Sequence, residues 1–563
     1  MVEMTTAVYP IDRKSGFCSK TTTFHSLRPA VHLPPPSQSI SLAEYTFYLL
    51  HQTTAGAFTS SSPPETPFLI DSSTDRRLTY SDLLQQTRSL ATSIQTLVPS
   101  LSNNDVAFIL APPSIHIPIL YFALLSIGVT ISPANPLATE SELAHMIKIS
   151  KPVIAFATRE TSSKLPSFPF GTVLIDSTDF NNMMQSKSNH KSLNREVKIN
   201  QSDSAAILYS SGTTGRVKGV ELSHRNFIAI IAGMYYLRRP RDETENVTNP
   251  VSLFPLPLFH VFGFFMLVRA AAMGETLVLM ERFDFERMLR FVEKYRVEYM
   301  PVSPPLVVAL SKSDIVMNYD LSSLKILGCG GAPLGKEVAE KFAVRFPDVE
   351  ITQGYGLTET SGAATRMIDV EETKQYGSAG MLAENTEAKI VDPGSGEALG
   401  PGQSGEIWLR GPTIMKGYIG DKEATVATMD PEGWLKTGDL GYFDENGFLY
   451  IVDRLKELIK YKAYQVPPAE LEHLLNTHPE IADSAVIPYP DEAAGEIPMA
   501  YIVRKQGSSI SEGQIMEYIA KQVSPYKKIR KVAFTAAIPK SPTGKILRRE
   551  LVNHAVSAVS SRL

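Results

Sequence analysis

Residues 209–219 constrain this chain more than any other segment. They read Tyr-Ser-Ser-Gly-Thr-Thr-Gly-Arg-Val-Lys-Gly and follow an apolar run over 205–208 that predicts a buried strand. Gly212 and Gly215 permit backbone conformations that a β-carbon would forbid. Several N–H groups can then converge on one anion, and the hydroxyl groups and Lys218 add further donors. The spacing differs from that of a Walker A loop, but the preceding strand and the closing lysine still predict a loop that holds nucleotide phosphates.

Four further motifs follow along the chain. They are QGYGLTE at 353–359, KTGD at 436–439, VDRLKELIK at 452–460 and PTGKILRR at 542–549. Each one alone is a weak signal, because Gly-Asp pairs and Gly-Lys turns are common on protein surfaces. Together and in this order, across residues 40–555, they resemble the adenylate-forming superfamily of acyl-CoA synthetases, luciferases and adenylation domains. Residues 253–260 and 330–335 are most similar to the plant 4-coumarate:CoA ligases and their peroxisomal relatives.

Length and composition predict a multidomain globular protein. A chain of 563 residues is too long for one ordinary core. The net charge of -4 argues against a general nucleic-acid binder. With only Cys18 and Cys329, a disulfide framework is excluded and a reducing compartment is indicated. Cys329 lies in an apolar context beside two glycines, so we interpret it as a small buried residue rather than a nucleophile.

The apolar stretches do not predict a membrane span. Residues 115–131 contain His116 and Pro118, and residues 252–268 contain two prolines and His260, so both are expected to be buried elements of a large core. The N-terminal residues also lack the charged and then apolar pattern of a secretion signal.

The last three residues, Ser561-Arg562-Leu563, are similar to the peroxisomal address Ser-Lys-Leu and keep its central positive charge. We therefore expect a peroxisomal enzyme whose C-terminus is recognised by the import receptor, and a cytoplasmic one if that tail is not recognised.

Hydrophobic periodicity predicts the fold class. Short apolar runs that read as strands occur at 106–110, 153–156, 173–175, 277–280 and 325–327. Helical patterns, such as that over 285–295, lie between them, and this alternation predicts parallel sheets covered by helices. After about residue 380, strands interrupted by Gly and Pro (388–391, 405–409 and 448–452) predict a β-rich subdomain.

The charge-dense segment 453–456 predicts a domain boundary. Beyond it, an amphipathic helix opening at Pro468 and a capping box at Ser511 and Gln514 predict a compact α+β tail. We expect an extended arm over 1–39, an ATP- and acid-binding domain over 40–452, a hinge over 453–456 and a C-terminal domain over 457–563. Polar, turn-rich residues at 60–67 and 181–200 are interpreted as surface loops. The resemblance implies that the C-terminal domain is a mobile lid.

The resemblance implies a two-step reaction that uses ATP, Mg²⁺ and coenzyme A. Transfer of AMP from ATP to a carboxylate makes a mixed anhydride with a good leaving group, and a thiol then displaces AMP to give a thioester. The first step brings a carboxylate against a polyphosphate. It therefore requires a phosphate loop, a metal ion and a lysine that reaches both groups.

The resemblance also assigns the nucleotide site residue by residue. Positions matching the β- and γ-phosphate loop are Ser210, Ser211, Gly212, Thr213, Thr214, Gly215 and Lys218. Positions matching the α-phosphate and metal contacts are Thr358 and Glu359, with Thr214 as a second metal position. Positions matching the adenine wall are Gly331, Ala332, Gln353, Gly354 and Tyr355. Positions matching the ribose contacts are Asp439 and, in an assisting role, Arg454.

Three lysines and a histidine match the catalytic positions of the family. Lys545 matches the adenylation lysine, and Lys460 matches a lysine that enters the site when the lid turns for thioester formation. Lys456 matches the hinge residue, and His260 an aromatic gate near the carboxylate. The positions on the coenzyme A side are Arg282, Lys462 and Ala463, of which Arg282 aligns only across a one-residue gap.

These residues also have ordinary structural interpretations. Lys545 could be a solvated surface lysine, and the lysines over 456–462 could form one solvated charge run. Glu359 could be an acidic residue at a helix N-terminus, and His260 a core histidine. Their joint agreement with one family pattern is what favours the catalytic roles.

The chain departs from authentic 4-coumarate ligases at three places. Phe262 stands where those enzymes have a tyrosine, so the hydroxyl that would bond the phenol of coumarate is missing. The order LTETSGA over 357–363 replaces the usual MTEAGP, so the pocket wall differs. Ala463 replaces a glycine on the pantetheine path, which costs about 1 kcal/mol if a positive φ is needed. The residues expected to line an apolar acid pocket are Phe262, Phe265, Met266, Gly330 and Gly356.

We therefore expect an ATP-dependent acyl-CoA synthetase that acts on an apolar acid, such as a fatty acid, an oxylipin precursor or a cinnamate-like acid. One alternative is an adenylating enzyme that feeds a carrier protein or an oxygen-dependent reaction, as in luciferases. The short segment after Lys545 counts against a modular synthetase. The other alternative is a non-catalytic acyl-adenylate or nucleotide-binding protein, against which the presence of Lys545 and Glu359 counts.

Overall fold

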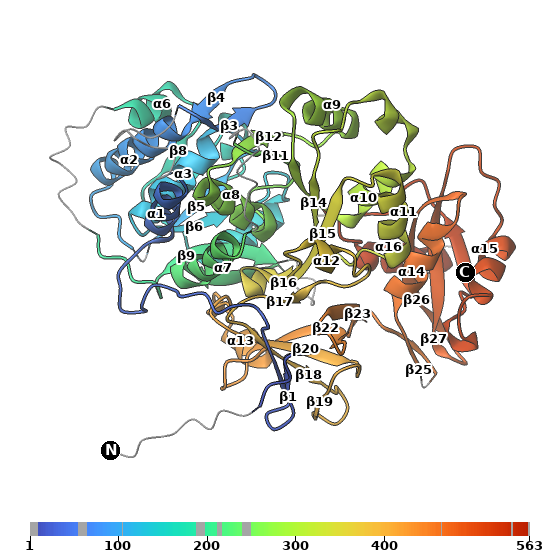
Figure 1. Cartoon of the computed structure of the whole chain (residues 1–563). Helices are drawn as coiled ribbons and strands as arrows, with labels where there is room; N and C mark the ends of the chain where they lie inside the picture. Colours follow the sequence, from blue (N-terminus) through green and yellow to red (C-terminus); the bar gives the residue numbers. More distant parts are fainter. Residues whose placement is uncertain are drawn as a thin grey trace, which may run out of the picture.

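The computed structural model describes residues 10–54, 65–103, 105–186, 197–210, 217–238, 249–462, 464–541 and 544–560, and the side chains of all of these up to residue 555. Two helix-covered sheets form the larger body, a β-rich part lies below them in Figure 1, and a smaller α+β part lies beside them.

The first sheet has seven strands. In spatial order they are β21 (Gly417–Tyr418), β10 (Lys218–Ser223), β9 (Ser204–Ser210), β6 (Thr130–Pro133), β5 (Val106–Leu110), β7 (Ile154–Ala157) and β8 (Thr172–Leu174). The strands from β9 to β8 are parallel. All five residues of β5 are buried, as expected of a central strand covered on both faces. Its helices are α2 (Tyr80–Leu97), α3 (His116–Ser126), α4 (Glu140–Ser150), α5 (Arg159–Ser162) and α6 (Thr178–Gln185).

The second sheet has nine strands. In spatial order they are β17 (Met381–Leu382), β16 (Gly362–Arg366), β15 (Glu350–Leu357), β14 (Ile326–Cys329), β13 (Tyr299–Val302), β11 (Val251–Phe254), β12 (Thr276–Leu279), β3 (Pro67–Asp71) and β4 (Arg77–Thr79). The strands from β15 to β3 are parallel. Accompanying helices are α1 (Leu42–Thr54), α7 (His224–Tyr236), α8 (Val261–Met273), α9 (Phe285–Tyr295), α10 (Pro304–Lys312), α11 (Lys336–Arg345), α12 (Val370–Thr373), η1 (Asp314–Asn318) and η2 (Thr358–Thr360).

Helix α8 lies inside the main hydrophobic core. The ring of Phe264, on this helix, packs against Tyr121 of α3 and Phe227 of α7. The ring centres are 5.6 and 4.8 Å apart, respectively. The helix is apolar nearly all round, which is typical of a helix buried between layers. One core cluster joins its residues to both sheets, so α8 is held firmly where the two sheets meet.

The β-rich sheet includes the N-terminal arm. Its strands are β1 (Phe17–Cys18), β2 (Thr23–His25), β18 (Glu387–Val391), β20 (Gly405–Arg410), β22 (Leu435–Phe443) and β23 (Leu449–Arg454), with β19 (Ala398–Leu399) beside β18 and helix α13 (Lys422–Thr428) nearby. Phe24 pairs with Ala388 and is fully buried. Arg28 forms a buried ion pair with Glu372. The arm over 10–39 is therefore an integral part of the folded body.

The C-terminal part has its own five-stranded sheet and core. Its strands are β25 (Tyr464–Val466), β24 (Ile459–Tyr461), β27 (Gly495–Arg504), β26 (Ile481–Asp491) and β28 (Lys531–Phe534), and its helices are α14 (Pro468–Thr477), α15 (Glu512–Ala520), η3 (Pro525–Lys527) and α16 (Arg548–Ser560). Figure 1 shows it beside α10 and α11. Lys312, at the end of α10, donates to the carbonyl oxygens of Asn476 and Ile481, at 2.9 and 3.1 Å, and so fastens the two parts together.

Strand β5 and helix α9 have the ends that the sequence predicts, and the other predicted strands form with ends shifted by at most two residues. One expectation is wrong in part, because residues 181–185 of the predicted 181–200 loop belong to α6. Ser177 caps this helix, and Phe180 and Met184 are buried on one face of it. Burial of that apolar face outweighs the polar composition of the segment. Among the helices over the described residues, none is both long and apolar enough to cross a membrane.

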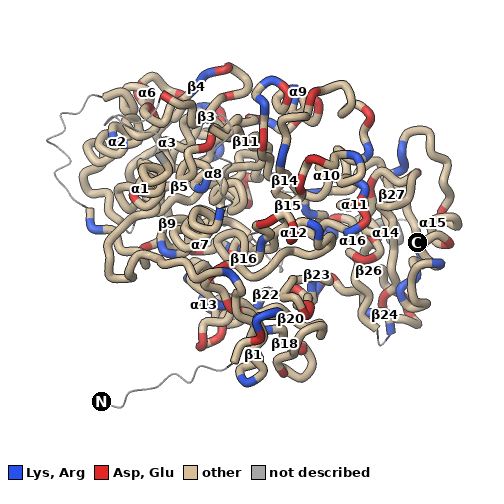
Figure 2. The backbone as a smooth tube through the Cα atoms, in the orientation of Figure 1, with Lys and Arg blue, Asp and Glu red and all other residues tan. Residues whose placement is uncertain are grey.

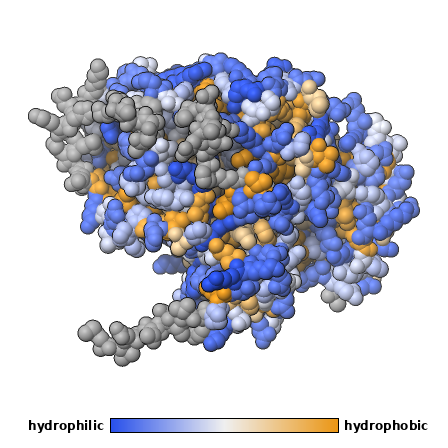
Figure 3. Space-filling model, viewed as in Figure 1, coloured by the Kyte–Doolittle hydropathy of each residue, from blue (hydrophilic) through white to orange (hydrophobic). Residues whose placement is uncertain are grey.

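The surface charges are mixed. Lys and Arg alternate with Asp and Glu along the backbone of every part in Figure 2. In Figure 3, hydrophilic residues cover most of the visible face and apolar residues gather along its centre. The mixture of both signs of charge in Figure 2 accords with the small net charge of -4.

Candidate active site

A cavity of about 1510 Å³ lies where the two large sheets, the β-rich sheet and the C-terminal part meet. It opens along the carboxyl ends of β14 and β15, where ligands bind in open parallel sheets. The predicted site residues that line it are Ser210, Lys218, His260, Phe262, Phe265, Met266, Gly330, Gly331, Gln353, Gly354, Tyr355, Gly356, Thr358, Glu359, Asp439, Arg454, Lys456 and Lys545.

Asp439 and Arg454 face each other across one strand pair. They are register partners on β22 and β23, and Arg454 Nε lies 3.4 Å from Asp439 Oδ1. The hydroxyl of Tyr355 donates to Asp439 Oδ2 at 2.8 Å. Burial raises the pKa of Asp439, while Arg454 opposes that effect. Asp439 is thus a buried carboxylate whose orientation is fixed by Tyr355 of β15. A carboxylate held in this way can accept hydrogen bonds from the two hydroxyl groups of a sugar.

Lys218 and Glu359 meet around a tyrosine that the sequence motifs do not include. Lys218 Nζ lies 4.3 Å from the ring centre of Tyr418, whose hydroxyl donates to Glu359 Oε1 at 2.9 Å. Strand β21 brings Tyr418 there by pairing with β10, opposite Val220. This end of the cavity thus holds a cation and a carboxylate that contact the same tyrosine. The loop residues Ser211, Gly212, Thr213, Thr214 and Gly215 lie outside the described residues.

Glu359 offers a carboxylate, the kind of ligand that hard metal ions take. Among the described residues, His, Cys, Asp and Glu side chains form no group of three that could hold a metal by themselves. Mg²⁺ is commonly held by one or two carboxylates together with substrate phosphates, so a lone carboxylate beside Lys218 fits that ion and no dedicated protein cage is required.

Lys545 reaches the cavity from a tight turn of the C-terminal part. The turn is closed by hydrogen bonds from Gly544 and Lys545 to Ser541 and from Ser541 back to Lys545. Gly544 has φ 83° and packs so closely on the larger body that an added β-carbon would lie 2.8 Å from Oγ of Ser303. Burial, with Arg454 nearby, lowers the pKa of Lys545 to about 8. Lys545 therefore stands beside the cavity as a desolvated cation.

His260 begins helix α8 and is neutral. Its Nδ1 accepts a hydrogen bond from the peptide N–H of Phe262 at 3.3 Å. Burial, with Lys545 nearby, lowers its pKa to about 4. Because Nδ1 accepts, the proton of the neutral ring is on Nε2, which leaves one N–H donor for a ligand.

The cavity continues past His260 into a pocket along α8. Phe262 and Phe265 stack with ring centres 5.6 Å apart on one side of α8. Gly330 closes the opposite wall, and an added β-carbon there would lie 3.3 Å from the ring of Phe262. With Met266 and Gly356 also lining the cavity, the first part of this pocket is apolar.

Comparison with known proteins assigns the chain to a family. A model of the AMP-binding enzyme family matches residues 58–419, more than half of the chain, and one of the AMP-binding enzyme C-terminal domain matches residues 470–545. The chain belongs to the AMP-binding enzymes. The predicted adenylate-forming superfamily is thereby confirmed, and the protein is an AMP-forming acid–thiol ligase by class.

Two plant proteins and one bacterial protein illustrate what this AMP-binding enzyme is similar to. It is 57% identical to 4-coumarate--CoA ligase-like 9 of Arabidopsis thaliana over 98% of both chains. It is 44% identical to the peroxisomal OPC-8:0-CoA ligase 1 of the same plant, over 97% of this chain and 99% of that one. An O-succinylbenzoate coenzyme A synthetase from Bacillus subtilis, in complex with ATP and a magnesium ion, superimposes with a TM-score of 0.73 at 26% identity, covering 89% and 98% of the two chains. The predicted fold class is confirmed by that likeness.

Several predicted residues of the AMP-binding enzyme lie away from the cavity. Lys460 and Lys462 are exposed on the β24–β25 hairpin, and Arg282 is exposed between β12 and α9. Ala332 is half-buried beside Gly331 and does not line the cavity. Ala463 lies outside the described residues, so its cost on the pantetheine path stays a prediction. In this orientation of the C-terminal part, therefore, Lys545 is in the site and Lys460 is not.

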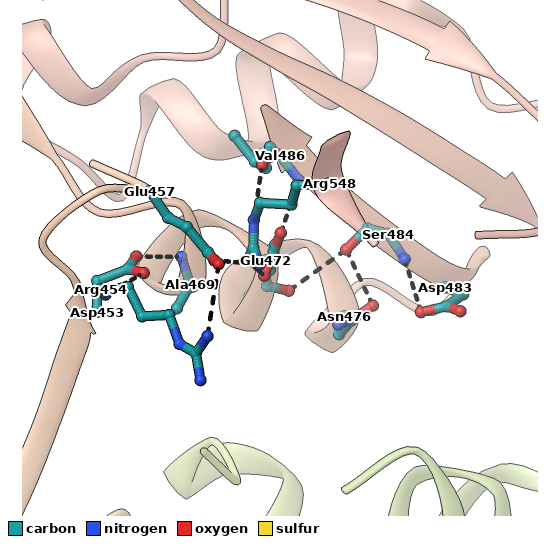
Figure 4. A network of polar contacts seen from close by, with 10 residues as sticks. All are labelled: Asp453, Arg454, Glu457, Ala469, Glu472, Asn476, Asp483, Ser484, Val486 and Arg548. Carbon is teal, nitrogen blue, oxygen red and sulfur yellow. Dashed lines mark hydrogen bonds and ion pairs between the residues drawn. The ribbon is translucent and has the colours of Figure 1, made fainter. Parts of the chain in front are cut away.

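A buried ion network holds the turn that carries Lys545 (Figure 4). Arg548 donates to Glu457 at 2.7 Å and to Glu472 of α14 at 2.6 Å. Arg454 lies 4.0 Å from the same Glu457. Asp453, at the end of β23, accepts from the peptide N–H of Ala469 at 2.9 Å. The segment predicted to be a hinge is thus tied directly to the lysine turn.

Adenylate formation should lose rate as the pH rises through about 8. Lys545 has a pKa of about 8 in place of its ordinary 10.5, so its charge is present below that pH and is lost above it. Initial rates at low substrate, measured as pyrophosphate release from pH 6.5 to 9.5, report this free-enzyme group. Lys545→Arg should flatten the fall, because a guanidinium stays charged.

Lys456 is the matched control, because its pKa is also lowered to about 8. Lys456→Arg should keep the fall above pH 8. If Lys456→Arg flattens the fall above pH 8 and Lys545→Arg does not, the titrating group is Lys456 and the prediction is contradicted.

Proposed function

We propose that this protein is an ATP-dependent carboxylate–CoA ligase that makes an acyl-adenylate and then an acyl-CoA thioester from an apolar acid. One observation carries the proposal. A single cavity brings Lys545 of the C-terminal part together with Asp439, Glu359 and the neutral His260, and it continues into an apolar pocket. Those are the groups that joining a carboxylate to a nucleotide phosphate requires.

Each group has one role in the first step. Asp439 accepts from the ribose hydroxyls, while Lys218 and Lys545 offset the charge of the phosphates and the attacking carboxylate. The Nε2–H of His260 orients a carboxylate oxygen at the mouth of the apolar pocket. Glu359 would hold Mg²⁺, which supplies charge neutralisation at the phosphates when bound. The solved relative in complex with ATP and a magnesium ion supports these cofactors.

The second step needs another orientation of the C-terminal part. Lys460 is exposed in the present one, and the coenzyme A positions Arg282 and Lys462 are exposed with it. We infer that residues 453–456 form the hinge between a domain over 40–452 and a lid over 457–563, preceded by the arm over 1–39. Turning about Lys456 would withdraw Lys545 and bring in Lys460.

The two lysines should separate the half-reactions. Lys545→Ala should slow adenylate formation by about 10²–10³, the effect of losing one preorganised donor at developing charge, and should still convert a supplied acyl-adenylate with coenzyme A. Lys460→Ala should show the reverse. Quenched-flow measurement of each half-reaction tests this. If both variants lose the rate of the same half-reaction to the same extent, the C-terminal part does not use two orientations for the two steps.

The acid is apolar near its carboxylate. Phe262, Phe265 and Met266 offer no hydrogen-bonding group to a phenol at that depth. A fatty acid, an oxylipin precursor or a cinnamate-like acid therefore suits this part of the pocket better than 4-coumarate.

Competition assays should show that 4-coumarate is not the preferred acid. An apolar pocket rejects an added hydroxyl only modestly, so cinnamate should exceed 4-coumarate in kcat/KM by up to about 10²-fold. Phe262→Tyr should narrow that gap, and Phe283→Tyr, at an exposed position that does not line the cavity, serves as the control for a hydroxyl added elsewhere. The proposal on the acid fails if 4-coumarate has the highest kcat/KM of the panel.

We further propose that the enzyme is peroxisomal. The ending Ser561-Arg562-Leu563 supports this, although it lies outside the described residues. The name of the peroxisomal relative at 44% identity supports it as well. The proposed partner is the import receptor that reads such C-termini.

Removal of the last three residues should move an N-terminal fluorescent fusion from puncta to the cytosol. Purified protein without them should keep its activity, because the described site lies elsewhere. Puncta that persist after the deletion would show that the ending does not direct import.

A further inference from the structure

The end of helix α14 is completed by side chains of the larger body. The last four carbonyl oxygens of an α-helix have no partner within the helix. In α14 the hydroxyl of Thr477 donates to the carbonyl oxygen of Leu474 at 2.6 Å, and the peptide N–H of His478 donates to that of Leu475 at 3.1 Å. The two remaining carbonyl oxygens, those of Asn476 and Thr477, accept hydrogen bonds from outside the C-terminal part.

The donors are Lys312, the last residue of α10, and Lys341 of α11. Lys312 Nζ donates to the carbonyl oxygens of Asn476 and Ile481 at 2.9 and 3.1 Å. Lys341 Nζ donates to the carbonyl oxygen of Thr477 at 3.2 Å. Cations stabilise the negative end of a helix dipole, most of all where the site is partly buried. We call these two residues the lysine clamp.

The clamp belongs to the present orientation of the C-terminal part. Burial, with Lys505 and Lys341 nearby, lowers the pKa of Lys312 to about 8, so this side chain has lost much of its contact with water. A desolvated ammonium group needs hydrogen bonds in place of those it made to water. Rotation about residues 453–456 would carry α14 away, return Lys312 to solvent and leave the two helix carbonyl oxygens to water.

Helix α10 connects the clamp to the active site. Lys312 is its last residue, and Ser303 precedes its first. The turn that carries Lys545 packs against Ser303, since a β-carbon added to Gly544 would lie 2.8 Å from Ser303 Oγ. At about 1.5 Å per residue, the two contacts are about 12 Å apart along the helix. The C-terminal part is thus held at both ends of α10, and the clamp fixes the angle at which Lys545 enters the cavity.

We propose that Lys312 and Lys341 are positioning residues for adenylate formation, because they hold the end of α14 and so keep Lys545 in the cavity. This inference rests on the proposed function, whose second step needs another orientation of the C-terminal part. The hydrogen bonds of the clamp form in the first orientation and are exchanged for water in the second. The clamp therefore sets the equilibrium between the two orientations.

Removal of a clamp lysine should change the ratio of the two half-reaction rates. Each rate is proportional to the population of the orientation that performs it, so the ratio reports the equilibrium between them. Lys312→Met keeps an apolar stem without the ammonium group. It should lower the ratio of adenylate formation to thioester formation about tenfold, the effect of losing hydrogen bonds to a charged donor. Lys341→Met, which loses one hydrogen bond in place of two, should lower it less.

The rates are measured separately. Adenylate formation is followed with the acid that has the highest kcat/KM among fatty acids, cinnamate and 4-coumarate, and thioester formation with its acyl-adenylate and coenzyme A. Lys336→Met is the matched control, because Lys336 of α11 forms an ion pair with Glu340 one turn along its own helix, at 3.8 Å. It should leave the ratio unchanged. Lys312→Arg should restore most of it, since a guanidinium also donates to carbonyl oxygens. If Lys312→Met lowers both rates by the same factor, or neither, the proposal is overturned.

A crosslink at the same interface separates positioning from any other effect of the lysine. A β-carbon added to Gly335, before α11, would lie 3.5 Å from Cβ of His473 on α14, a separation found in disulfides. The native Cys18 and Cys329 are buried and should not compete. Gly335→Cys combined with His473→Cys, once oxidised, should keep adenylate formation and lose thioester formation until it is reduced. In that oxidised protein, Lys312→Met should have no effect on adenylate formation, because the disulfide replaces the clamp. A defect that persists there would overturn the proposal.

The wild-type protein separates failure of this inference from failure of the proposed function. If it forms an acyl-adenylate and passes the acyl group to coenzyme A, but the clamp variants keep the wild-type ratio, the proposed function stands and the clamp has no role. If it adenylates no acid or transfers no acyl group to coenzyme A, the proposed function fails and this inference with it. Should Lys312→Met fail to fold, Lys341→Met, with and without the crosslink, decides the proposal.

Discussion

The buried ion pairs of Arg548 are the interaction on which the arrangement of the active site depends. This one guanidinium joins Glu457, in the turn after β23, to Glu472 on α14, and it follows Lys545 by three residues. Its removal would leave buried carboxylates without a partner, which is strongly destabilising. The lysine turn, the end of the β-rich sheet and α14 are therefore one mechanical unit (Figure 4). Movement of the C-terminal part must carry the whole network with it.

The electrostatics of the cavity favour an incoming polyanion. Lys545 and Lys456 are partly desolvated and stand near Arg454, and these conditions lower the pKa of both lysines to about 8. Cations that are held together at this cost are stabilised when phosphates arrive between them. The same positive charge helps to keep His260 neutral, which leaves its N–H free to donate to a ligand. Under the proposed function, nucleotide binding and acid positioning would be linked through these few groups.

Helix α8 lines the cavity along much of its length. His260, which caps the helix, lies at the end near Lys545, an apolar face follows, and Arg269 lies further along beside Tyr299. The helix is wedged between α3 and α7 by Phe264, so its lining face keeps a fixed distance from β14.

The sequence by itself determined the alternation of strands and helices and the types of residue in each nucleotide motif, because both depend on neighbours along the chain. Strand β5 and helix α9 follow directly from their apolar patterns. Only the tertiary structure decided which side chains meet. Tyr418 joins Lys218 to Glu359 because β21 pairs with β10 across two hundred residues, and no local pattern marks it. The polar surroundings of Arg269 likewise arise where α8, β11 and β13 converge. The docking of the C-terminal part decided that Lys545 occupies the site and Lys460 faces solvent, since this depends on contacts between surfaces far apart in sequence.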